Sequence, residues 1–235
     1  MALVRLVACI TLIAAAVSSA SAAVYTIDPS GQGDYASIPE GFNYVQHPDA
    51  LELVPGQYEV SGWGWPIVLD ADSPTLTGRG GAEATLLVGD GETAAFTVPG
   101  NQWSTRMYLT GITFRDLGAL SVRSGDYGSL TIQLVDCVVE NCGSSSGVNA
   151  SWGSSSSLIS GCKILNSPGS GIYTYHFNGT IEYCEIAGSG YSGVRGSCCE
   201  EPVIRNNHIH DNGWHGVYGP WDYVVEDNLI EHNGK

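Results

Sequence analysis

A short phrase recurs six times, with drift, in the second half of this chain, and it constrains the fold more than any other feature. Its clearest copies are residues 203–213, VIRNNHIHDNG, and residues 224–234, VVEDNLIEHNG. The turn residues of successive copies lie 21 to 25 residues apart, at Ile112, Cys137, Cys162, Cys184, Asn207 and Asn228. A repeat this short, rich in β-branched residues, is typical of a solenoid whose coils pack on one another.

Apolar residues keep fixed positions around each turn residue. Three positions before it stand Leu109, Leu134, Ile159, Ile181, Ile204 and Val225, and two positions after it stand Phe114, Val139, Ile164, Ile186, Ile209 and Ile230. In four copies a further apolar residue follows a glycine, at Val148, Ile172, Val194 and Val217. Side chains alternate along a strand, so these positions predict about three short strands per coil, each pointing one apolar residue inward.

This pattern predicts an all-β fold, a single-stranded parallel β-helix, and the crossover rule favours the right-handed form. Coils stacked about 4.8 Å apart would pair every backbone group and place like residues over like. We expect ladders of asparagine or cysteine at the corners, since asparagine tolerates left-handed backbone and its amide bonds the next asparagine. Leucine-rich and helical repeats fit less well, because the Leu-rich phrase and the 3.6-residue period are missing.

The N-terminus predicts export. Arg5 precedes an apolar stretch, residues 6–17, and Ala20-Ser21-Ala22 is a typical cleavage site, so residues 1–22 are interpreted as a signal peptide. The mature chain would be secreted, periplasmic or on the cell surface, with no membrane span. Cleavage would leave 8 basic against 24 acidic residues. This excess of negative charge disfavours nucleic acid and anionic membranes as partners.

The rest of the chain divides into three parts. Residues 23–60 are expected to form an N-terminal strand and a capping helix, with a capping box at Ser37 and Glu40. Residues 61–108 read as irregular early coils, in which Trp63 and Trp65 are expected to pack against the cap. Residues 109–235 are the regular coils, which stop at a repeat phrase and are expected to be truncated at the C-terminus.

The cysteines fall into two groups. Cys137, Cys162 and Cys184 share one inward column and Cys142 lies in another, where a thiol acts as a small buried hydrophobe. Adjacent coils lie near disulfide reach, so a bond within this column stays open. A bond between the neighbours Cys198 and Cys199 is a further alternative. No pair has the Cys-x-x-Cys spacing of a zinc site.

The first half of the chain carries a family resemblance. The stretch 31–38, GQGDYASI, followed by 53–58, LVPGQY, resembles the opening of pectin-lyase-like right-handed β-helix proteins, among them pectin methylesterases. With the repeats, the resemblance spans nearly all of the mature chain. It implies the fold and not a reaction, because that superfamily includes lyases, hydrolases, esterases, epimerases and non-catalytic surface proteins. The catalytic motifs of its esterases, polygalacturonases and pectate lyases do not occur here.

Two groups of residues are candidates for function. His210, Asp211, Glu231 and His232, with His208 nearby, lie on two adjacent coils and offer an acid–base pair or ligands for a divalent metal. They also fit a solvated outward face. Trp152, Tyr175, Trp214 and Trp221 offer flat rings for stacking on sugars, or for packing over the corner backbone.

The leading hypothesis is an exported β-helix module for surface display or for binding a polysaccharide or cell-surface glycan. The first alternative is a polysaccharide lyase, epimerase or glycoside hydrolase whose site lies near His210 and Glu231 or in missing coils. The second is a structural spacer. No cofactor is predicted, although Ca²⁺ stays open as a bridge to an anionic polysaccharide, and no metal site is assigned.

Overall fold

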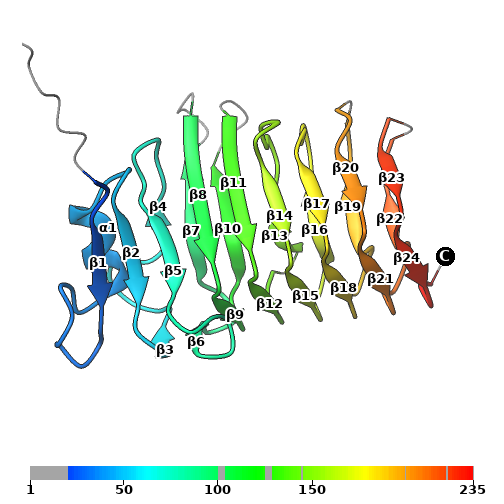
Figure 1. The fold of residues 1–235 in the computed structure, drawn as a ribbon. Helices are drawn as coiled ribbons and strands as arrows, with labels where there is room; N and C mark the ends of the chain where they lie inside the picture. Colours follow the sequence, from blue (N-terminus) through cyan, green and yellow to red (C-terminus); the bar gives the residue numbers. More distant parts are fainter. Residues whose placement is uncertain are drawn as a thin grey trace, which may run out of the picture.

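The computed structural model of this protein describes residues 21–99, 104–124, 129–143, 145–198, 200–220 and 222–234, and the side chains of 121–124 are not described. Nearly all of the predicted signal peptide therefore lies outside the described residues. The described strands pair in parallel and stack along one axis, from β1 beside the helix to β24 at the other end (Figure 1). The predicted parallel β-helix is confirmed.

Two long sheets run the length of the stack. Sheet 1 holds nine strands, in the order β1 Val24–Ile27, β2 Ala50–Leu53, β5 Thr75–Gly78, β8 Ser104–Thr110, β11 Ser129–Val135, β14 Leu158–Ser160, β17 Thr180–Glu182, β20 Val203–Arg205 and β23 Val224–Glu226. Sheet 2 holds eight, in the order β3 Gly56–Glu59, β6 Thr85–Val88, β9 Thr113–Arg115, β12 Val138–Glu140, β15 Lys163–Leu165, β18 Glu185–Ala187, β21 His208–His210 and β24 Leu229–Glu231.

Two shorter sheets supply the third strand of each coil. Sheet 3 contains β4 Ile67–Val68, β7 Ala94–Pro99 and β10 Ala119–Ser124. Sheet 4 contains β13 Ser146–Asn149, β16 Ser170–Thr174, β19 Val194–Gly196 and β22 Val217–Tyr218. Each regular coil before the last therefore has three strands, as the repeat predicts, and the last described coil contributes β23 and β24.

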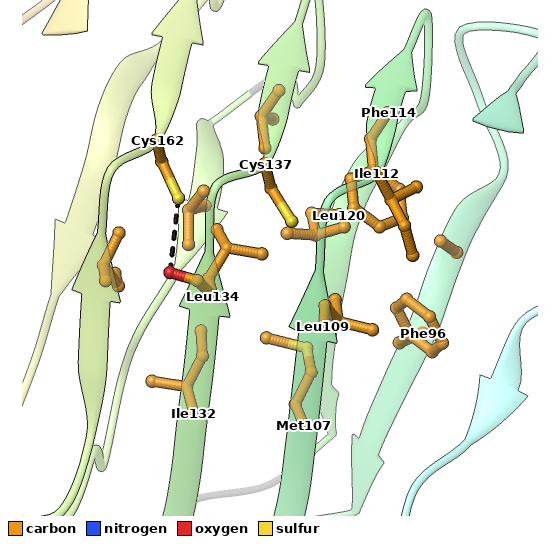
Figure 2. Packing of buried hydrophobic residues seen from close by; sticks show 14 of the residues in the cluster. Phe96, Met107, Leu109, Ile112, Phe114, Leu120, Ile132, Leu134, Cys137 and Cys162 are labelled. Atoms are coloured by element: carbon orange, nitrogen blue, oxygen red, sulfur yellow. Dashed lines mark hydrogen bonds between the residues drawn. The ribbon is translucent and has the colours of Figure 1, made fainter. Parts of the chain in front are cut away.

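The register places like residues over like. In sheet 2, Ile164 pairs with Ile186, which pairs with Ile209, which pairs with Ile230. The first three of these are fully buried in the core. Figure 2 shows the same stacking earlier in the chain, where Leu109 lies beside Leu134 on neighbouring strands. The inward columns read from the sequence are the columns of the core as far as β21, whereas Val225 and Ile230 of the last described coil are each 43% exposed.

Asparagine side chains close the corners of the last coils. The buried Asn207 accepts the Cys184 N–H at 2.9 Å through Oδ1, and its Nδ2 donates to the Ile181 carbonyl at 3.0 Å and to Asn228 Oδ1 at 3.0 Å. A second ladder joins Asn212 to Asn233 in the same way. The predicted asparagine ladder is confirmed.

The left-handed backbone at these corners differs from expectation. It lies one residue before the ladder residue, at Gly111, Asp136, Gly161, Tyr183, Asn206 and Asp227, and not at Asn207 or Asn228. The residue that reverses the chain direction points outward, whereas the ladder residue must point inward to reach the neighbouring coil. The two tasks therefore fall on adjacent positions.

The cysteine column is reduced. Cys137, Cys142, Cys162 and Cys184 are buried free thiols, and the Cys162 thiol donates to the Leu134 carbonyl at 3.2 Å (Figure 2). The interpretation as small buried hydrophobes is confirmed. Burial raises the pKa of Cys137 to about 12 and that of Cys142 to about 11, so both stay protonated at neutral pH.

The helix α1, Ile38–Tyr44, covers the first coil. Ser37 caps it by accepting the Glu40 N–H at 3.3 Å, and the Glu40 carboxylate accepts the Ala36 N–H at 3.0 Å. The prediction for Trp63 is wrong: this side chain is 96% exposed, and only Trp65 packs against the core. Within the described ranges, no helix is long and apolar enough to cross a membrane.

Candidate functional site

The first candidate group lies on the outward face of sheet 2, where β18, β21 and β24 are neighbours. His208 Nε2 lies 3.1 Å from Glu231 Oε1, and His210 Nδ1 lies 2.7 Å from Asp211 Oδ2. The two imidazole rings are 4.0 Å apart. The structure thus brings both histidines together with carboxylates, because alternate residues of β21 share the outward face.

Hydrogen bonds from neighbouring side chains lower the pKa of two carboxyl groups here, Asp211 and Glu185. The hydrogen bond from His210 lowers the pKa of Asp211, and the Lys163 ammonium lowers the pKa of Glu185. Glu185 Oε1 lies 3.7 Å from His210 Nε2, a buried atom that makes no hydrogen bond. His232, in contrast, is exposed in the turn after β24.

This face offers acid–base pairs but not a metal site as it stands. Among the described residues, no three ligand atoms here lie within 4.8 Å of one another. The pairs are those that exposed strand neighbours make in many sheets, and such pairs contribute little free energy.

The aromatic candidates fall into two separate places. Trp152 and Tyr175 lie together after β13 and β16, with ring centroids 5.6 Å apart, and Trp152 also stacks on His176 at 4.3 Å. Trp214 lies elsewhere, in the turn that precedes β22. Trp221 lies outside the described residues. The described rings of this candidate group therefore fall into two clusters.

The second cluster is larger than the sequence suggested, and we call Tyr191, Trp214, His215 and Tyr218 the aromatic shelf. Trp214 contacts Tyr191 edge-on at 5.9 Å and Tyr218 at 4.9 Å, and His215 stacks on Tyr218 at 5.2 Å with an angle of 7° between the rings. Tyr191 is 51% exposed and Tyr218 is 43% exposed. The rings are held by one another and remain open to solvent.

Glycines make room for this shelf. A Cβ added to Gly213 would lie 2.5 Å from the Gly190 carbonyl oxygen, so the coils approach too closely there for any side chain. The result is a hollow of about 280 Å³ that Gly190, Tyr191, Gly213 and Trp214 line. Flat backbone beside exposed rings leaves space for a planar or ring-shaped ligand.

A basic group stands next to the shelf. The Arg195 guanidinium lies over the Tyr191 ring, 5.7 Å from its centroid, and Arg195 pairs along sheet 4 with Tyr173 on one side and Tyr218 on the other. Its Nε atom is buried and makes no hydrogen bond. Arginine on an aromatic face gains cation–π stabilisation and keeps donors for a ligand.

The sequence reasoning missed Tyr191 and Arg195. A signal was present, because Tyr191 and Trp214 each directly follow the glycine of the same repeat column, Gly190 and Gly213. Because the coils stack in register, residues at the same position of successive repeats, such as Tyr191 and Trp214, lie side by side on one surface.

A larger hollow, of about 490 Å³, lies over Val225, Ile230 and Tyr223. Val225 and Ile230 align with the buried Ile204 and Ile209 of the preceding coil. This hollow belongs to the inward columns of the last described coil, and His215 and Tyr223 are also among its lining residues.

Comparison with known proteins concerns the fold. Residues 146–235 match the family model described as "Right handed beta helix region". No curated protein matches the chain significantly.

Two solved structures resemble it: the A-module of the mannuronan C-5 epimerase AlgE6 of Azotobacter vinelandii (15% identity, 78% of this chain and 83% of that one, TM-score 0.29) and ORF18 of Geobacillus virus E2 (12% identity, 79% of this chain and 52% of that one, TM-score 0.22). Both TM-scores are too low to support an argument about function. The topology and the family model together show that the chain has the right-handed parallel β-helix fold.

Proposed function

We propose that this protein is an exported β-helix module that binds carbohydrate through the aromatic shelf. One observation carries the proposal: Tyr191, Trp214 and Tyr218 form a contiguous set of partly exposed rings beside a glycine-lined hollow. Export rests on the signal sequence of residues 1–22.

The chemistry of the shelf suits a sugar. A pyranose presents a face of C–H groups that packs on an aromatic ring, and its hydroxyl groups need hydrogen-bond partners at the rim. Arg195 and His215 stand at the rim of the shelf, and both carry N–H groups or ring nitrogens for hydroxyl or carboxylate oxygens. Mutual ring contacts limit the conformational entropy that the side chains lose on binding.

The test is retention on immobilised neutral and uronic polysaccharides, with and without Ca²⁺. We expect Trp214→Ala to weaken binding about tenfold, since one stacked ring contributes about 1.4 kcal/mol. Trp63→Ala is the matched control, because Trp63 is exposed at the other end of the molecule and should leave retention unchanged. Arg195→Gln tests the rim: it should weaken retention of uronic chains more than of neutral ones.

The rival function is catalysis on the outward face of sheet 2, which the close pair His208–Glu231 favours. In that case Glu231→Ala or His210→Ala abolishes turnover of a polysaccharide, while retention survives. The absence of both retention and product on every polysaccharide would overturn carbohydrate binding and leave a structural spacer.

A further inference from the structure

A second cluster of reactive side chains lies at the turn after sheet 4, away from the aromatic shelf. His176 Nδ1 lies 2.8 Å from one carboxylate oxygen of Glu200 and 3.0 Å from the other. The Cys198 sulfur joins them, and the three ligand atoms all lie within 4.8 Å of one another. Nitrogen, oxygen and sulfur donors thus converge from two successive coils. All three residues are partly buried.

The His176 ring is held in place by its neighbours. Trp152 stacks on it, with an angle of 26° between the rings and 4.3 Å between their centroids, and Tyr175 meets it edge-on at 4.4 Å. These contacts fix the plane of the imidazole and leave its nitrogen edge turned to Glu200. A ligand residue that is oriented before the metal arrives loses little conformational freedom on binding.

The backbone has a positive φ angle at this turn in three successive coils. Trp152, His176 and Cys198 occupy equivalent positions, and each has a positive φ, of 61°, 51° and 146°. Most other non-glycine residues with positive φ here are Asn or Asp, which accept this conformation readily. Histidine shares this tolerance, whereas Trp152 and Cys198 carry a conformational cost of the kind that gathers at functional sites.

Cys198 takes part in a disulfide bond. A sulfur in a disulfide has no thiolate form and is a poor metal ligand, so in the oxidised chain the ligands of this described group are reduced to His176 and Glu200. Reduction by a dithiol transfers two electrons and two protons, breaks the S–S bond and yields two thiols, while the reductant closes to its own disulfide.

We propose that His176, Cys198 and Glu200 form a zinc site that reduction of the Cys198 disulfide opens. A thiolate, an imidazole and a carboxylate are three ligands that Zn²⁺ takes, and their number leaves one position of a tetrahedron for water or another donor. The metal displaces the thiol proton of Cys198 as it binds. Thiolate and imidazole select Zn²⁺ over Ca²⁺ and Mg²⁺, which prefer oxygen donors.

The experiment uses the full chain without an affinity tag and compares its oxidised form with the form reduced by a phosphine. A phosphine is a suitable reductant because it binds zinc weakly and is itself converted to its oxide. A chromophoric chelator measures Zn²⁺ affinity, and Co²⁺ replaces Zn²⁺ to give a sulfur-to-metal absorption band. We expect one zinc per reduced chain, bound about a hundredfold tighter than by the oxidised chain, and a cobalt band only after reduction.

Single-residue variants test whether zinc binding depends on His176, Cys198 and Glu200. Cys198→Ser should remove the cobalt band and the response to reduction, and His176→Ala and Glu200→Gln should each weaken zinc binding at least about tenfold. His208→Ala is the matched control, because His208 also faces a carboxylate but lacks a third ligand, and it should bind zinc like the parent chain. Equal affinity in both redox states, a band that persists in Cys198→Ser, or no band after reduction would each overturn the proposal.

Discussion

Replacing Ile209 by Asp should unfold the coils around β21. The Ile209 side chain is 0% exposed and packs between Ile186 and Ile230 of the adjacent coils. Its loss forfeits about 1.5–3 kcal/mol of apolar burial. The new carboxylate would be buried without a partner at a further cost of several kcal/mol. The total, at least about 5 kcal/mol, rivals the whole stability of a typical domain.

The assay is a thermal and a urea melt, followed by circular dichroism, with two comparison variants. Ile209→Val keeps the inward packing and should cost about 1 kcal/mol. His210→Ala changes the neighbouring outward side chain, which is 19% exposed, and should cost about 1 kcal/mol or less. Equal losses for Ile209→Asp and His210→Ala would mean that the inward and outward columns are reversed, and would refute the reasoning.

Three further predictions concern the corners and the outward face. Asn207→Ala should cost about 2–4 kcal/mol in urea melts, because the buried Cys184 N–H and Ile181 carbonyl lose a partner. His210→Ala should raise the pKa of Asp211 in an NMR titration, because the hydrogen bond from His210 lowers that pKa. The pair stabilises the fold above the unfolded pKa of Asp near 3.8, and this stabilisation is lost as the pH falls through the lower pKa of Asp211 in the folded chain. Cys137 should resist alkylation in the native chain at pH 7 and react after unfolding, which mass spectrometry detects.

The regular coils could be predicted because one period repeats in register. An inward column in the sequence becomes an inward column in space when each coil repeats the last, so Ile186, Ile209 and Ile230 were assigned without any knowledge of the turns. The same logic identified the asparagine ladder and the buried cysteines. The fold follows from alternation within strands and repetition between them.

The positions of turn side chains did not follow from the sequence. The alternation of side chains along a strand does not determine the direction of a side chain between strands. Trp63 was therefore expected to pack against the cap, whereas it is almost fully exposed. Trp214 was grouped with Trp152, yet it packs on Tyr191 and Tyr218 instead. Both errors concern large rings in turns, where the direction of a side chain depends on the neighbouring coil.

Stacking also explains how the few cations of this acidic chain are used. Arg115 bonds Glu140, Lys163 bonds Glu185 and Arg205 bonds Glu182, in each case directly across to the adjacent coil. Arg79 bonds Glu52 of the adjacent coil diagonally, because Glu52 itself pairs with Thr77. These ladders relieve repulsion between carboxylates that the coil spacing would otherwise bring together.

Arg106 and Arg195 lie over tyrosine rings instead, Arg106 over Tyr108 and Arg195 over Tyr191. With a net charge of −15, the molecule as a whole repels an anionic polymer. An acidic sugar chain would therefore gain attraction at the shelf from Arg195, against repulsion from the net negative charge of the molecule. Retention of uronic chains should rise with salt up to the point at which long-range repulsion is screened, whereas retention of neutral chains should not depend on salt.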